Sequence, residues 1–257
     1  MTVRPILFSG PMIRALMDGR KTQTRRVLTL GGRRPDYIGP RGCTEDPACW
    51  GWDDGRSGYI LADRDSDDPR AATWHDFAAS WRAGDRAWVR EAHAILPATA
   101  YRGSIGTGTI FQTVHPTDGY SAAVMREGFD RSGAPRWRPS IHMPRWASRL
   151  TLTVTDVRVQ RLQDISEDDA RSEGIERRTF TKLDGTDPQE WWVGHENGRA
   201  TARSAFRDLW DSLNADRAPW DSNPWVVALS FTVRCGNIDQ VGLTDRQLRD
   251  QITGGGA

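Results

Sequence analysis

The segment from Gly19 to Arg26 holds the side chains of this sequence that are best suited to chemistry. It runs Gly-Arg-Lys-Thr-Gln-Thr-Arg-Arg, and Lys21 is one of only two lysines among 35 cationic residues. Lysine can lose its proton and act as a base, whereas arginine keeps its charge in proteins. Lowering a lysine pKa from about 10.4 to roughly 7–8 takes about 4 kcal/mol. Burial and repulsion from the neighbouring arginines both act in that direction.

Thr24 lies three residues after Lys21 and carries a hydroxyl that an adjacent base could activate. In a regular strand these two side chains point to opposite faces. A shared site therefore requires an irregular backbone between them. Without it, the segment is a basic connection between a helix and a strand that lies in solvent.

Glu173 is a third candidate, at the expected end of a helix. Ser166 with Asp169 resembles a capping box, and Gly174 marks the helix end. The helix dipole disfavours an anion at this end by about 0.3–1 kcal/mol. The carboxylate is therefore functional, solvated, or paired with an arginine such as Arg177.

The 19–26 segment resembles the motif of ASCH domains, which belong to the PUA-like superfamily of small β-barrels. Bacterial N(4)-acetylcytidine amidohydrolases of this family carry Gly-Arg-Lys-Thr-x-Thr-x-Arg. The matching residues here are Gly19, Arg20, Lys21, Thr22, Thr24 and Arg26. The whole chain resembles the longer stand-alone ASCH proteins of phage and prophage genomes. The similar segments cover roughly half of it: 4–28, 84–95, 136–175 and 203–235.

This resemblance implies an amidohydrolase that removes an acyl group from the exocyclic amine of a modified cytosine, as nucleoside or nucleotide. Lys21 falls on the family's catalytic lysine, Thr24 on its nucleophilic threonine and Glu173 on its glutamate. Amide hydrolysis needs a nucleophile, a base and an acid for the leaving amine, and these three residues would supply them without a cofactor. Other ASCH proteins are thought to bind RNA, and some are described as ribonucleases. A non-catalytic module that binds RNA, DNA or a modified base, and a ribonuclease, therefore stay open as alternatives.

Further substrate-binding candidates share a cationic, aromatic or hydrogen-bonding side chain near these segments. They are Arg20, Arg26, Trp88, Arg90, Glu91, Ser140 and His142. A structural salt bridge explains Arg90 and Glu91 equally well, because charges inside an alternating strand need partners. Cys43, Cys49 and His75 lack the usual spacing of zinc ligands, so no metal is expected.

The elements that must position these residues indicate a mostly β protein with some α structure. We expect an α+β fold built on a PUA-like barrel with a few flanking helices. Strands are predicted over 4–9, 87–91, 149–160 and 225–233, and helices over 10–18, 166–173 and 206–213. A single domain would span 1–235, with insertions at about 29–83, 96–135 and 176–202, followed by a tail over 236–257.

The net charge and the hydropathy of the sequence indicate which partners and which cellular location to expect. The net charge of +1 does not predict the strongly basic surface typical of proteins that bind long nucleic acids. No run approaches the roughly 20 apolar residues of a membrane span, and the first residues lack the apolar run of a signal peptide. We expect a cytoplasmic protein, in the host cytoplasm if phage-encoded, with no membrane partner.

Overall fold

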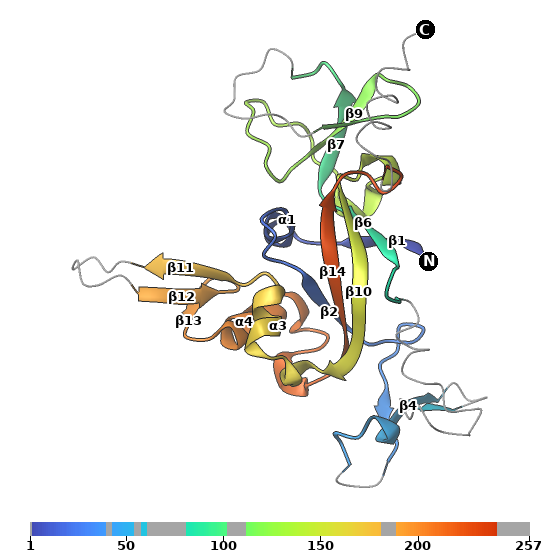
Figure 1. The fold of residues 1–257 in the computed structure, drawn as a ribbon, viewed down its shortest axis with the longest axis vertical. Coiled ribbons are helices and arrows are strands. Elements are labelled where there is room, and N and C mark those ends of the chain that lie inside the picture. The colour runs from blue at the N-terminus through green and yellow to red at the C-terminus, as the bar shows by residue number, and fades with distance from the viewer. Residues whose placement is uncertain are drawn as a thin grey trace. The chain divides into compact units, whose positions relative to one another are not determined.

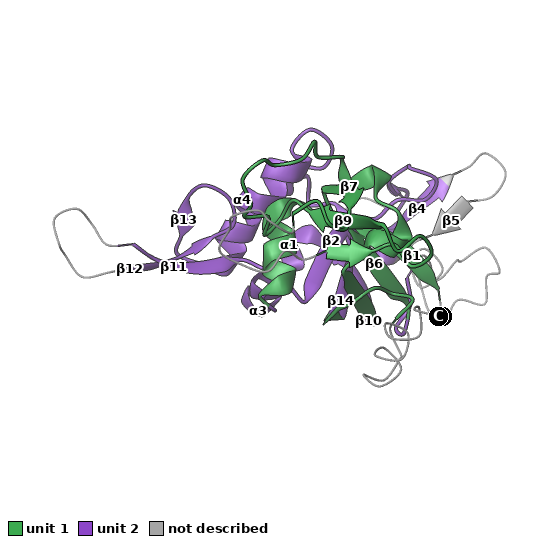
Figure 2. Ribbon diagram, turned by 90° about the horizontal axis from the view of Figure 1, so that it is seen from above, with its two compact units in different colours: residues 1–18, 85–153, 232–257 green, residues 19–84, 154–231 purple. Residues whose placement is uncertain are grey.

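The computed structural model describes residues 2–39, 43–53, 58–60, 81–101, 112–180 and 189–240, and strands predominate over helices in these ranges. Two compact units are distinguished by their internal contacts (Figure 2). The first comprises residues 1–18, 85–153 and 232–257, and the second 19–84 and 154–231. Two long strands, β10 (Leu150–Arg161) and β14 (Trp225–Cys235), contribute residues to both units.

The first unit begins with a strand and a short helix, both of which were predicted. β1 (Val3–Leu7) pairs in parallel with β6 (Arg86–Arg90), and β6 pairs antiparallel with the start of β10. α1 (Gly10–Met17) starts with a proline in its first turn, where the missing N–H costs no hydrogen bond. Gly19 follows the helix with a φ of 72°, a conformation that glycine adopts without strain.

A second sheet of the first unit occupies part of the range expected to be an insertion. Its strands run in the order β7 (His93–Pro97), β9 (Ser121–Met125) and β8 (Gln112–Val114), all antiparallel. Two 3-10 turns follow, Ser140–His142 and Arg145–Ala147, and each begins directly after a proline. The 96–135 insertion is therefore partly structured.

The second unit contains the motif strand and both helices that were expected after residue 160. β2 (Gln23–Val27) pairs antiparallel with β14 (Figure 1). α3 (Glu167–Ser172) is capped by Ser166, whose side chain accepts a hydrogen bond from the Asp169 N–H, and Gly174 follows with a φ of 96°. The predicted capping signals at both ends of this helix are confirmed.

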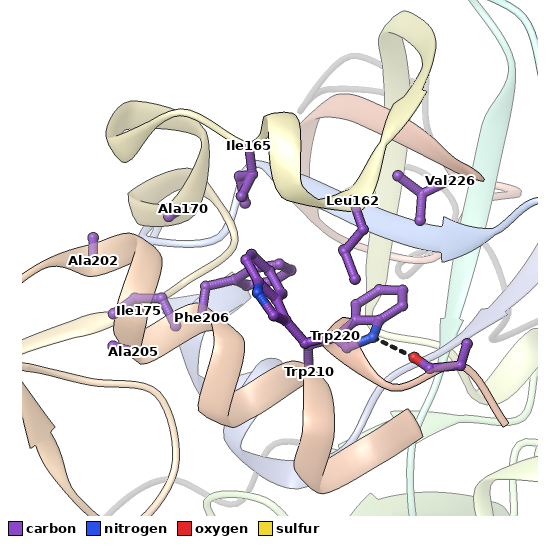
Figure 3. Packing of buried hydrophobic residues seen from close by; sticks show 11 residues of the cluster. Leu162, Ile165, Ala170, Ile175, Ala202, Ala205, Phe206, Trp210, Trp220 and Val226 are labelled. Carbon is purple, nitrogen blue, oxygen red and sulfur yellow. Dashed lines mark hydrogen bonds between the residues drawn. The ribbon is translucent and has the colours of Figure 1, made fainter. Parts of the chain in front are cut away.

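The core of the second unit forms around α4 (Ala202–Asn214), which contacts α3 (Figure 3). Its buried cluster comprises Leu162, Ile165, Ala170, Ile175, Ala202, Ala205, Phe206, Trp210, Ala218, Trp220 and Val226. The Trp210 indole N–H donates to the Ala218 carbonyl at 2.7 Å, so this buried polar atom is satisfied. The cluster supports the α3 segment on which Glu173 lies.

Two small sheets of the second unit lie in ranges where the sequence predicted insertions. One has the order β11 (Glu176–Phe180), β12 (Gln189–Val193) and β13 (Gly198–Arg199), and the other β3 (Asp36–Tyr37), β4 (Trp50–Asp53) and β5 (Gly58–Ile60). Three strands therefore lie within the insertion expected over 176–202. β11 has no buried residue, so the alternation that reveals strands is missing there.

The expected mostly β architecture with few helices is confirmed, but a barrel is not observed. Among the described strands each sheet has two edges, and none closes on itself. Within the same ranges no helix is both long enough and apolar enough to cross a membrane. The sequence also favours helices over 74–81 and 243–252, but residues 74–80 and the whole of the second range lie outside the described residues.

Candidate functional site

Lys21 and Glu173, 152 residues apart in the chain, form a buried ion pair in the second unit. The Lys21 Nζ donates to the Glu173 Oε2 at 2.8 Å and to the Glu173 carbonyl oxygen at 2.8 Å. Their side chains are 0% and 3% exposed. A β-bridge joins the two backbones, and the Thr22 N–H donates to the Ser172 carbonyl at 2.8 Å. The bridge brings the motif segment to the end of α3.

The pKa of Lys21 is lowered from its ordinary value, chiefly because burial penalises the charged ammonium. The charge of Glu173 and its hydrogen bond oppose this effect, while the charges of Arg26 and Arg25 add to it. The direction is the one expected from the sequence. A lysine in this setting is closer to proton exchange at neutral pH than an exposed one.

Arg25 also belongs to this network, as a partner of Glu173 that the sequence did not predict. Its guanidinium donates to the Glu173 Oε1 at 3.1 Å and to the Asp169 Oδ2 at 2.8 Å, and the side chain is 0% exposed. The Arg25 guanidinium also donates to the Gln23 Oε1 at 2.5 Å. The Glu173 carboxylate therefore forms ion pairs with both Lys21 and Arg25. Its arginine partner is Arg25 and not Arg177, which pairs with Glu190 instead.

Asp169 is the second carboxylate of the network. Burial would raise the pKa of Asp169, but the hydrogen bond from Arg158 and the charge of Arg25 outweigh it and lower that pKa. Gln23 also donates to its Oδ1 at 3.1 Å. Alternation along an extended chain, which puts residues 21, 23 and 25 on one side, is the signal that could have identified Gln23 and Arg25.

Thr24 does not join Lys21 and Glu173. It lies inside β2, opposite Leu229 of β14, and is 3% exposed. Because β2 is a regular strand, its side chain points away from the face that carries Gln23 and Arg25. Among the described residues, no hydrogen bond connects Thr24 to the ion pair. The irregular backbone that would bring Thr24 to Lys21 is not present.

The two arginines predicted to bind substrate in this unit differ in setting. Arg20 is half-buried and donates to the Gly174 carbonyl at 2.8 Å, next to Glu173. Arg26 is exposed at the surface of β2. Arg20 thus helps to hold the α3 end against the motif segment, and Arg26 remains accessible to solvent.

Trp88, Arg90 and Glu91 belong to the first unit and have structural contacts there. Glu91 is 1% exposed and receives two hydrogen bonds from the Arg149 guanidinium, at 3.0 and 2.8 Å. Burial raises the pKa of Glu91, and this arginine opposes the shift. Trp88 is buried, with the Arg90 guanidinium 4.6 Å from its ring centroid. The salt-bridge alternative thus holds for Glu91, with Arg149 as partner.

Ser140 and His142 also lie in the first unit, on the first 3-10 turn. Ser140 is half-buried, and His142 is exposed and lines a pocket of about 580 Å³. Another pocket, of about 640 Å³, lies in the second unit beside α4 and includes Arg199 and Asp208. Neither of these two pockets is lined by Lys21, Thr24 or Glu173.

The part of the chain that the structure describes holds no group of three or more potential metal ligands. His75 lies outside that part, and Cys43 and Cys49 are unpaired thiols. What the described residues do bring together is an amine with a lowered pKa and a carboxylate, a pair that can relay a proton. Comparisons of the chain with protein-family models, with curated proteins and with solved structures find no match.

Proposed function

We propose that this protein is an amidohydrolase of the ASCH type, in the PUA-like superfamily. Its substrate would be a cytosine nucleoside or nucleotide acylated on the exocyclic amine. The observation that most supports this proposal is the buried Lys21 amine, 2.8 Å from the Glu173 carboxylate. The resemblance of residues 19–26 to the amidohydrolase motif supplies the substrate class.

In this proposal Lys21 is the general base and Glu173 the general acid. Thr24 Oγ attacks the acyl carbonyl, and Lys21 takes up the hydroxyl proton. The proton passes through Glu173 to the exocyclic nitrogen as the C–N bond breaks, and water then hydrolyses the acyl ester on Thr24. Because Thr24 faces away from Lys21 in β2, this route requires a local rearrangement of the strand. Lys21 is fully buried, so the reaction also requires an opening that admits the substrate.

The proposal is tested by incubating the protein with a panel of N4-acylated cytidines and their 5′-monophosphates. We expect release of the free acid and the unmodified cytosine compound from at least one member, measured by chromatography. RNA of the same base composition serves as a parallel substrate. Cleavage of that RNA without deacylation of any panel member would replace the proposal by the ribonuclease alternative.

Thr24 variants test the nucleophile. Thr24→Val removes the hydroxyl at nearly constant volume, and Thr24→Ser keeps it. With Thr24 as nucleophile, we expect kcat/KM to fall by at least about 10²-fold in the valine variant and to survive in part in the serine variant. Mass spectrometry of the quenched reaction should show an acyl adduct only where the hydroxyl is present. Equal activity in all three proteins would assign the attack to water.

The pH dependence of hydrolysis should follow the deprotonation of the Lys21 amine. Its neutral form is the base, and burial lowers its pKa, so kcat/KM should rise with pH and level off below the ordinary lysine value of about 10.4. Between the lowered pKa of folded Lys21 and its ordinary value of about 10.4, the unfolded chain binds more protons than the folded one. The free energy of unfolding should therefore rise with pH across this interval. A kcat/KM that stays constant from about pH 6 to 10 would contradict a lysine base.

A further inference from the structure

A pocket of about 580 Å³ in the first unit has a composition unlike that of the buried ion-pair network. It is lined by residues 94–96 of β7, by the segment from Arg136 to Pro139, and by His142. The β7 residues are apolar, and the others include two guanidinium groups, an indole and an imidazole. None of the described residues that line the pocket carries a carboxylate. Such a lining favours a ligand that is both aromatic and anionic.

Within the described part of the chain, the two arginines of this pocket have no carboxylate counterion, unlike neighbouring arginines. Arg131 pairs with Asp130 at 2.9 Å, and Arg145 pairs with Asp239 at 2.5 Å. By contrast, Arg136 and Arg138 form no ion pair and no side-chain hydrogen bond with any residue in the described ranges. Both are exposed. Their charge is therefore available to an anion from solution.

The backbone around the pocket is held in place. The Arg138 N–H donates to the His93 carbonyl at 2.7 Å, and the His93 N–H donates to the Arg138 carbonyl at 3.2 Å, which fixes the segment to β7. The His142 N–H donates to the Pro139 carbonyl at 3.1 Å within the 3-10 turn. The cationic side chains thus extend from a backbone that is already ordered, which lowers the entropy cost of binding.

Trp137 is half-buried and packed by its neighbours. Its ring meets that of Phe129 edge to face, at 5.1 Å between centroids and 82° between planes. Phe129 in turn packs against Tyr101 at 5.2 Å. An indole held in this way is a platform on which a base can stack, an interaction that tolerates every base.

We infer that this pocket binds a nucleotide unit, with its base against Trp137 and its phosphate on Arg136 and Arg138. The inference is independent of the hydrolase proposal, because it uses no residue of the Lys21–Glu173 network. A free mononucleotide and one unit of a single strand present the same chemistry. His142 lines the same pocket and adds a further hydrogen-bonding group.

The test is fluorescence anisotropy with fluorescein-labelled decathymidylate, and the unlabelled competitors are decathymidylate, CMP, cytidine and pyrophosphate. The key variant is Arg136→Glu with Arg138→Glu. The control matched in charge is Arg126→Glu with Arg234→Glu, at two exposed arginines of the same unit that do not line the pocket. We expect the key variant to weaken oligonucleotide binding at least about tenfold, and the control to stay within about twofold. The slope of log affinity against log salt should fall by about 0.7 for each arginine that contacts a phosphate.

The competitors and Trp137 variants separate the possible outcomes. Competition by CMP at a concentration that displaces the oligonucleotide identifies a mononucleotide site, and competition by unlabelled strand alone identifies a strand site. Trp137→Ala should weaken binding about tenfold or more, and Trp137→Phe should retain most of it. The inference is overturned if pyrophosphate competes as well as CMP, or if the key variant binds like the control. Thermal melts of all variants establish that each is folded.

Discussion

Lys21→Met is expected to lower kcat/KM for deacylation by about 10²- to 10⁴-fold, the usual contribution of a general base, while the protein stays folded. Methionine has a similar length and no charge, so it fills the space of the lysine without its amine. The Glu173 carboxylate keeps a counterion in this variant, because Arg25 donates to its Oε1 at 3.1 Å. The loss should therefore be one of turnover and not of folding.

Lys21→Arg provides the comparison between catalysis and binding. Arginine keeps the positive charge but cannot give up its proton, so a lysine base is lost while a binding cation is kept. We expect the arginine variant to be as inactive as the methionine variant. Because the site is sealed, its melting temperature is measured alongside to detect strain from the larger side chain. Full deacylation by a folded Lys21→Arg protein would exclude the general-base role.

Glu173→Gln is expected to destabilise the protein by about 3–5 kcal/mol, the usual cost of removing one partner from a buried ion pair. Lys21 has no exposed surface, and the Glu173 carboxylate is 2.8 Å from its amine. Arg25 would retain Asp169, but Lys21 would lose this counterion. Urea denaturation monitored by circular dichroism measures the change.

Two further variants test whether the loss of stability comes from the buried ion pair itself. Asp168→Asn removes a carboxylate from the same helix, but the Asp168 side chain is 90% exposed, so we expect a change within about 0.5 kcal/mol. The double variant Lys21→Met with Glu173→Gln removes both charges and should recover a large part of the stability lost in Glu173→Gln alone. A cost below about 1 kcal/mol for Glu173→Gln would mean that the pair is not held out of water as the structure places it.

The sequence alone predicted those helix ends and strands whose signals lie within a few neighbouring residues. The proline after Gly10 predicts the start of α1, and Ser166 and Gly174 predict both ends of α3. The continuous apolar run from Trp225 predicts β14. Caps, turn residues and apolar periodicity act through local backbone geometry, so they can be recognised without knowing the fold.

The tertiary structure alone decided which charges meet. Glu173 is shared between Lys21 and Arg25 because an isolated β-bridge joins Lys21, just before β2, to Glu173 at the end of α3, 152 residues away in the chain. It also decided that Thr24 faces away from that pair, and that Arg136 and Arg138 are left without counterions among the described residues while their neighbours are paired. Ion-pair partners depend on contacts between distant segments, and residue types carry no record of those contacts. Side-chain chemistry was therefore visible in the sequence, and its spatial combination was not.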